Sequence, residues 1–328
     1  MGRLGQGVGK KPVNMRYLAG DVPPAAVTWV NALQYVAVTS SFLVFPLIIA
    51  REAHAPAAVA DSMLSWSMLV LAIGTTLQAL PKGPVGSGYL APSVMTAVYV
   101  GPSLEAVRIG GLALMSGMTL FGGLLEAAVS KSLNRLRSVL PPELAGVVIF
   151  LVGMSNGVVG LRYLLQPDGA ATFGARHWLV AAVTLAVMVS ANVWSRGVLG
   201  LSCALVGMLS GYAVAIASGL LPVQMLAEIT TLPVLAFPSV DHIGWSFDVT
   251  LVLPFTIAAL ANTLKAAALL TASQRLLDAD WTRPDLAPIS RGVLADGITT
   301  MISGAFSVFG VNVSASSVGL TAATGVVF

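Results

Sequence analysis

Lys265 is a charged side chain inside an otherwise uncharged apolar segment. It lies in Val249–Leu270, which reads VTLVLPFTIAALANTLKAAALL and is long enough to cross a bilayer. A cation near the middle of such a helix costs about 2.5–3.5 kcal/mol on insertion scales, so it usually faces a cavity. The residue therefore predicts a polar site within a membrane. The alternative is a lysine that snorkels to one interface or pairs merely to hold helices together.

Two other apolar segments are interrupted by Gly, Ser and Pro. In GSGYLAPSVMTAVYVGPS we expect an extended stretch over Gly88–Ser93 and a half-helix from about Val94. In VNVSASSVGLTAATGV we expect extended Val311–Ser314, followed by a half-helix that begins near Ala315–Ser317. Irregular backbone at membrane depth survives only inside protein or beside a cavity, because lipid satisfies no hydrogen bonds. Two half-helix N-termini would together form a partly positive pocket of free N–H groups.

Polar residues in these segments are candidates to join Lys265. Ser93, Ser316 and Ser317 stand at the expected half-helix starts, where serine acts as a helix cap or as a small packing residue. Gln34 offers both a donor and an acceptor, which suits an amide-like edge.

Three further polar residues are open to two interpretations. Tyr35 is either a stacking or hydrogen-bonding residue of the site or a packing residue. Asn262 and Asn312 are polar at a similar depth, and they either line the site or support the backbone.

The acidic residues are placed outside this site. Glu126 is assigned to a helix end, and Asp296 is assigned to the start of a segment, where it could pair with a neighbouring arginine. Asp278, Asp280 and Asp285 belong to the DADWTRPD connection, where we expect solvated or capping side chains.

The sequence contains no recognisable set of residues for covalent or metal chemistry. Cys203 is the single cysteine, and its apolar run LSCALVGML predicts a small packing side chain. His54, His177 and His242 fall in separate connections. We therefore expect no enzymatic activity, no bound metal and no cofactor.

The composition is that of a polytopic membrane protein. Of 328 residues, 56% are hydrophobic and 9% are charged, against about 25% charged residues in soluble proteins. The net charge of +3 and its spread over the loops do not favour a nucleic-acid partner. Ten apolar segments are expected: Val27–Ala50, Met63–Leu80, Ser87–Val100, Ile109–Val129, Leu144–Leu165, Trp178–Val193, Val198–Leu221, Val249–Thr271, Gly292–Phe309 and Val311–Val327.

The distribution of basic residues predicts the orientation. With these ten segments, most of the 17 Lys and Arg residues fall on the same side as the N-terminus. Cytoplasmic loops carry the excess of such residues, so we expect a cytoplasmic N-terminus.

A short internal sequence similarity relates the first and eighth segments. Asn31-Ala32-Leu33-Gln34 matches Asn262-Thr263-Leu264-Lys265, and the interrupted third and tenth segments match in kind. Seven segments separate the members of each pair, an odd number, so a second copy would run inverted. Interrupted segments at corresponding positions of inverted repeats point to a transporter binding site.

Several stretches together carry a family resemblance. They are Gln34-Tyr35, GYLAPS, RGVLADGITTMISGAF and NVSASSVGLTAATGV. The chain resembles the nucleobase–ascorbate transporter family, also called nucleobase–cation symporter family 2 or xanthine/uracil permeases. The resemblance implies an all-α polytopic fold of two inverted seven-helix repeats (7+7), divided into core and gate. It implies a cytoplasmic tail at 1–26, core segments at 27–135 and 249–328, and gate segments at 140–221.

The sequence departs from the family at its functional positions. Gln34-Tyr35 stands where the family usually has Gln-His, and Lys265 occupies the place of a substrate-binding Glu. Val94 replaces an aromatic residue, and Ser316-Ser317 replace a Gln/Glu-Asn pair before the retained Gly319. The expected substrate-binding residues are Lys265, Gln34, Tyr35, Ser93, Val94, Ala315, Ser316 and Ser317, supported by Asn262, Asn312 and Gly319.

These features together predict a secondary-active transporter of nucleobases. We expect oxopurines such as xanthine or urate as substrates, elevator-like alternating access, H⁺ or Na⁺ as coupling ion, a homodimer, and residence in the inner cell membrane. The chain ends inside the tenth segment, so the later helices are expected to be absent. The alternatives are a small-anion transporter of the same fold, for bicarbonate or sulfate, and a non-transporting fragment.

Overall fold

The structure is a computed structural model of the chain. It describes residues 17, 21, 23–133, 154, 157, 158, 161, 174–195, 203–221 and 237–324. The chain divides into two compact units, one formed by Met1–Val152 with Pro238–Phe328 and the other by Gly153–Phe237. The tail predicted at 1–26 and the segment predicted at 144–165 lie almost entirely outside the described residues.

The first unit begins with three apolar helices. They are α1 (Ala25–Ser40), which continues through the short 3-10 helix η1 (Ser41–Leu43) into α2 (Val44–Glu52), and α3 (Ala57–Ala79). Prolines precede two of these helices, Pro24 before α1 and Pro56 before α3. The fixed φ of proline suits a helix start, and a missing N–H costs nothing there.

The third predicted segment is interrupted, as expected. Strand β1 (Ser93–Met95) leads into the 3-10 helix η2 (Ala97–Tyr99) and then into α4 (Val100–Ser130). The half-helix expected from about Val94 therefore begins later, because residues 93–95 are held extended by pairing with another strand. Helix α4 is kinked at Gly110 and Gly111, and Gly111 has a φ of 68°, which glycine adopts without steric cost.

The C-terminal half of this unit repeats the pattern of helices and an extended stretch. It contains η3 (Val249–Leu251), α11 (Val252–Leu277), α12 (Leu286–Ala305), strand β2 (Val311–Val313) and α13 (Ala315–Thr324). The extended stretch at Val311 and the helix start at Ala315 confirm the prediction for the tenth segment.

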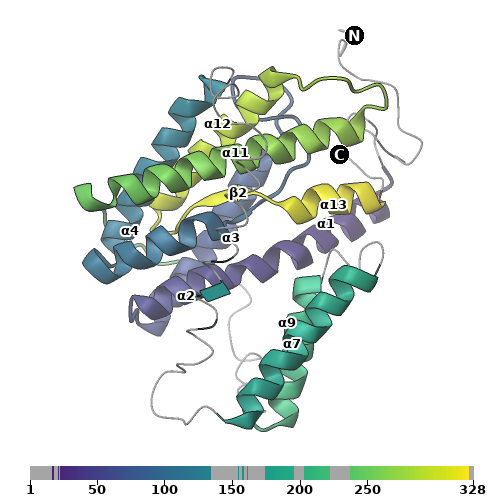
Figure 1. Ribbon diagram of the computed structural model, residues 1–328. Coiled ribbons are helices and arrows are strands. Elements are labelled where there is room, and N and C mark those ends of the chain that lie inside the picture. Colours follow the sequence, from purple (N-terminus) through teal and green to yellow (C-terminus); the bar gives the residue numbers. More distant parts are fainter. Residues whose placement is uncertain are drawn as a thin grey trace. The chain divides into compact units, whose positions relative to one another are not determined.

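Strands β1 and β2 form an antiparallel pair, with Ser93 opposite Val313, Val94 opposite Asn312 and Met95 opposite Val311. Every residue of both strands is buried. In Figure 1, α11 and α12 lie beside β2, and the contacts between elements agree. These two extended stretches, β1 and β2, thus satisfy each other's backbone groups, which lipid cannot do.

Helices α4 and α12 approach each other through glycines. A Cβ at Gly297 would lie 2.6 Å from the backbone nitrogen of Ala127, and one at Gly304 would lie 2.6 Å from that of Leu120. Small residues of this kind let helix backbones pack closely, which is the main source of helix association within a membrane.

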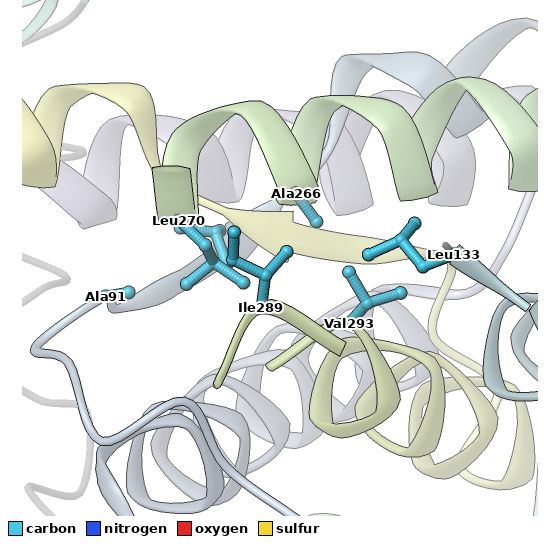
Figure 2. Close-up of a cluster of buried hydrophobic side chains, with 7 residues drawn as sticks. Ala91, Leu133, Ala266, Leu270, Ile289 and Val293 are labelled. Carbon is cyan, nitrogen blue, oxygen red and sulfur yellow. The ribbon is translucent and has the colours of Figure 1, made fainter. Parts of the chain in front are cut away.

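A hydrophobic cluster packs β2 and its neighbours together (Figure 2). Leu270 and Ala266 from α11 meet Ile289 and Val293 from α12. The cluster is completed by Ala91, Leu133 and Val313, all of which are buried.

The second unit contains two apolar helices, α7 (Ala175–Trp194) and α9 (Cys203–Ala217), which pack against each other. Gly211 of α9 lies against Thr184 of α7, and Cys203 accepts a hydrogen bond from Asn192 Nδ2 at 3.5 Å.

Five helical stretches among the described residues are long and apolar enough to cross a membrane. They are Ala25–Glu52, Ala57–Ala79, Ala97–Ser130, Ala175–Trp194 and Val249–Leu277. Their apolar side chains also face outward, since Trp29 is 76% exposed and Leu33 is 71% exposed. These spans match five of the ten predicted segments.

Candidate functional site

The side chain of Lys265 reaches the non-helical residue Thr96, between β1 and η2. Its Nζ lies 3.4 Å from Thr96 Oγ1, and Thr96 is the fully buried residue between β1 and η2. The same hydroxyl accepts from the N–H of Val98 and so caps η2. Lys265 is half-buried. Its ammonium group lies beside the start of η2 in the first unit.

Residues Asn262 and Asn312 join α11 to β2. Asn312 Nδ2 donates to the carbonyl oxygen of Asn262 at 2.8 Å, and Asn262 Nδ2 donates to the carbonyl oxygen of Val311 at 2.8 Å. Both side chains are fully buried. Of the two interpretations open from the sequence, these contacts match support of the backbone.

Tyr35 and Gln34 of α1 have different surroundings. The hydroxyl of Tyr35 lies 2.6 Å from Thr321 Oγ1 on α13, so the aromatic ring ties the first helix to the last. Gln34 is half-buried, and its buried Oε1 has no hydrogen-bond partner among the described residues. An unpaired amide oxygen of this kind is free to accept from a ligand.

A cavity of about 510 Å³ lies between α1, α3 and the stretch that enters β1. Its lining includes Tyr35, Thr75, Pro92 and Ser93 and is otherwise largely apolar. The structure thus brings Tyr35 and Ser93 to one cavity. Lys265 is not among the residues that line it.

The remaining predicted site residues lie on or beside the two strands. Val94 is buried in β1 opposite Asn312. At the start of α13, Ala315 is exposed, while Ser316 and Gly319 are half-buried. Ser317 belongs to the same helix, and its side chain is outside the described part of the structure.

A buried polar cluster that the sequence analysis did not predict lies one helical turn from Lys265. Glu126 of α4 and Asp296 of α12 are both fully buried. Asn262 Nδ2 lies 3.0 Å from Glu126 Oε1 and 3.4 Å from Asp296 Oδ2. The hydroxyl of Tyr99 donates to Glu126 Oε1 at 2.6 Å.

The expectation that Asp296 opens a segment is wrong. Helix α12 starts at Leu286, because Asp285 Oδ1 accepts from the N–H of Ala287 and caps it, and Asp296 therefore falls in mid-helix. Among the described residues, no arginine forms an ion pair with Asp296, so the expected arginine partner is not found there. The rule that singled out Lys265, a charge inside an apolar segment, would have found both acids.

Small residues make room for the bulky partner of this cluster. Tyr99 is fully buried, and a Cβ at Gly122 would lie 2.6 Å from its hydroxyl oxygen. Gly310 lies against the same ring, and Phe255 packs beside it with ring centroids 6.0 Å apart. Among the described residues, no group of three or more His, Cys, Asp or Glu side chains is arranged to hold a metal ion.

Comparison with known proteins assigns the family. A family model described as a permease family, that of the xanthine/uracil permeases, matches residues 27–327. The chain belongs to this permease family. The resemblance drawn from the sequence motifs is thereby confirmed, and the permease is an integral multi-pass membrane protein.

Individual relatives of the permease are bacterial. Xanthine permease XanP of Escherichia coli strain K12 is 27% identical over 310 residues, which cover 89% of this chain and 66% of XanP. Xanthine permease XanQ of the same strain is 26% identical over 324 residues, covering 93% and 68%. A uracil permease of Bacillus caldolyticus is 31% identical over 218 residues, covering 62% and 48%. The chain spans about two-thirds of the length of the two xanthine permeases.

Proposed function

We propose that this permease is a secondary-active transporter of nucleobases, and that oxopurines such as xanthine or urate are its substrates. The observation that carries the proposal is the position of Lys265, whose ammonium group lies beside Thr96, between β1 and η2. A fixed positive charge favours a ligand with acceptor oxygens or anionic character, which oxopurines have. Relatives whose names specify xanthine support the same class.

The proposed binding site is built on the two extended stretches, β1 and β2, and the helices that follow them. Backbone N–H groups at the start of α13 are directed toward the ligand, as helix N-termini commonly are toward anions. Ser93 and Val94 present the edge of β1, while Ala315, Ser316 and Ser317 open α13. Gln34 contributes its unpaired amide oxygen, and Tyr35 closes the site beside it.

The proposed transport mechanism is elevator-like alternating access. In it, residues 27–135 and 249–328 form the core that carries the substrate, and residues 140–221 belong to the gate. The pairing of two strand-plus-helix units, β1 with η2 and β2 with α13, supports an origin in inverted repeats. A homodimer in the inner cell membrane, with a cytoplasmic N-terminus and H⁺ or Na⁺ as coupling ion, completes the proposal.

A matched pair of lysine variants tests the proposed role of Lys265. Uptake of labelled xanthine, urate and uracil is measured in cells that express the full-length protein, the variant Lys265→Met or the variant Lys131→Met. Lys131 is exposed at the end of α4 and serves as the control. We expect loss of oxopurine uptake in the first variant and normal uptake in the second. Unchanged uptake of every substrate by Lys265→Met would remove this residue from the mechanism.

A second candidate function follows from the same positive charge. A lysine beside helix N-termini also suits a small oxyanion such as bicarbonate or sulfate. Competition separates the two functions: excess sulfate or bicarbonate leaves xanthine binding unchanged in a nucleobase transporter and displaces it in an anion transporter.

A further inference from the structure

The cavity between α1, α3 and the stretch that enters β1 is elongated along the first helix. On that side its wall includes residues spaced three or four positions apart through α1 and η1, namely Thr28, Ala32, Tyr35, Thr39 and Leu43. Residues at this spacing share one face of a helix. With a rise of about 1.5 Å per residue, the face extends over about 20 Å. The volume of about 510 Å³ is therefore that of a groove along the helix axis.

The groove opens on the outer surface of two helices. Val36 of α1 is 61% exposed and Met68 of α3 is 54% exposed, although both line the groove. Both helices are long and apolar enough to cross a membrane. The apolar side chains at the mouth are therefore continuous with the outward surface of α1 and α3, which faces hydrocarbon in a bilayer.

The wall of the groove offers few hydrogen-bonding groups. Thr39 Oγ1 donates to the carbonyl oxygen of Tyr35 at 2.8 Å, and Thr75 Oγ1 donates to that of Leu71 at 2.7 Å. The hydroxyl of Tyr35 is bonded to Thr321. Ser93 differs, because its buried Oγ has no hydrogen-bond partner among the described residues. A ligand with many polar atoms would leave most of them unpaired here, whereas a hydrocarbon chain has none to satisfy.

Strand β1 separates the groove from the ammonium group of Lys265. The side chain of Ser93 is directed toward α3, since a Cβ at Gly74 would lie 2.7 Å from its Oγ. Lys265 reaches Thr96, which is three positions later in the extended stretch. Side chains three positions apart in extended backbone point to opposite faces. The groove is therefore a different site from the one beside Lys265.

We propose that the groove binds one acyl chain of a membrane phospholipid. The hydrocarbon core of a bilayer is about 30 Å thick, so a chain from one leaflet covers about half of it and fits within the length of the groove. Apolar cavities exclude water and take up apolar ligands. A bound chain fills the space between α1, α3 and β1 and thereby stabilises the packing of α1. The inference goes beyond the proposed function and does not depend on it.

Photo-crosslinking tests this site in the purified protein. The protein is reconstituted with phosphatidylethanolamine that carries a diazirine in one acyl chain, washed with detergent, and irradiated before the labelled residues are found by mass spectrometry. We expect label to remain at Leu71, which lines the groove, and to be lost from Leu69 and Ile73, which are exposed on the same helix outside it. No retained label at Leu71 overturns the proposal, including the case in which another helix or a second copy covers the groove.

A matched pair of variants tests whether the groove itself holds the chain. Ala72→Phe fills the groove from α3, and Ile73→Phe adds bulk to the neighbouring residue, which does not line it. We expect most of the retained label to be lost in the first variant and kept in the second. Ala32→Phe fills the groove from α1 and replaces Ala72→Phe if that variant does not fold. Equal retained label in all folded variants contradicts the assignment.

Thermal unfolding gives a second readout with unlabelled phosphatidylethanolamine. Because a ligand that binds the folded state stabilises it, added lipid should raise the unfolding midpoint of the delipidated wild type and of Ile73→Phe more than that of Ala72→Phe. The same rise in all three proteins would contradict a specific site.

Competition with xanthine separates this inference from the proposed function. Excess xanthine should leave the retained lipid label unchanged, because the groove and Lys265 lie on opposite sides of β1. Displacement of the lipid by xanthine would assign the groove to the substrate and overturn the proposal. A protein that retains the lipid but binds no nucleobase refutes the proposed function and leaves the lipid site standing.

Discussion

Asn312 in strand β2 donates a hydrogen bond of 2.8 Å from its Nδ2 to the carbonyl oxygen of Asn262 in helix α11. The side chain of Asn262 in turn donates to the carbonyl oxygen of Val311. This exchange fixes the strand against the helix at the level of Glu126 and Asp296 and one turn from Lys265. The buried acids, the lysine and strand β2 are therefore held in one arrangement.

Removal of the Asn312 amide should loosen this arrangement. We expect Asn312→Ala to lower the free energy of unfolding by about 1–3 kcal/mol, because it deletes a buried hydrogen bond and leaves a small void. The thermal unfolding midpoint in detergent measures the change. Glu105→Ala, which alters an exposed side chain on α4, should leave the midpoint nearly unchanged.

The hydroxyl of Tyr99 should stabilise the buried acid pair. Tyr99→Phe keeps the ring and removes the donor to Glu126 Oε1. We expect a loss of about 1–3 kcal/mol in the free energy of unfolding, since a buried carboxyl loses its shortest hydrogen bond. In a double-mutant cycle with Glu126→Gln, the two effects should not add. Additive effects would show that the hydroxyl and the carboxyl do not interact. Tyr212→Phe, at an exposed position of α9, is the control.

The glycine contact between α4 and α12 should tolerate no side chain. A Cβ at Gly297 would stand 2.6 Å from the nitrogen of Ala127 and 3.0 Å from the carbonyl oxygen of Gly123. We expect Gly297→Ala to destabilise the protein by about 1–3 kcal/mol through overpacking. Gly101→Ala on α4 meets open space and should leave stability unchanged or raise it slightly. Equal unfolding midpoints for the two variants would contradict close helix packing here.

The start of η3, which leads into α11, should give a pH-dependent contribution to stability. Asp248 Oδ1 accepts hydrogen bonds from the backbone N–H and the hydroxyl of Thr250, and these bonds hold the pKa of Asp248 below its ordinary value. A lowered pKa in the folded state means that the contribution is present above the ordinary pKa and is lost as the pH falls through the folded-state pKa.

The variant Asp248→Ala measures this contribution. It should lower the thermal unfolding midpoint relative to the wild type at neutral pH, and the difference should shrink in acid. A difference that stays constant with pH would show that Asp248 does not act through its charge.

Local chemistry was sufficient to predict several elements. Val311–Ser314 precedes a run of small residues, and the structure has β2 at Val311–Val313 and α13 from Ala315. Asp285 was expected to be solvated or capping, and it caps α12. Each of these outcomes depends on residues that are neighbours in the sequence. The pairing of β1 with β2 joins segments about two hundred residues apart, and no local pattern specifies such a partner.

The sequence by itself determined that this chain is a membrane permease and predicted that Lys265 lies at membrane depth, because span length, composition and family motifs are properties of the chain alone. Only the tertiary structure decided which groups surround that lysine. Glu126, Asn262 and Asp296 come from three helices, and their meeting depends on glycines that let α4 and α12 approach and on strands that occupy the remaining space. The burial of these acids and their shared contact with Asn262 arise from this packing, which joins helices far apart in the sequence.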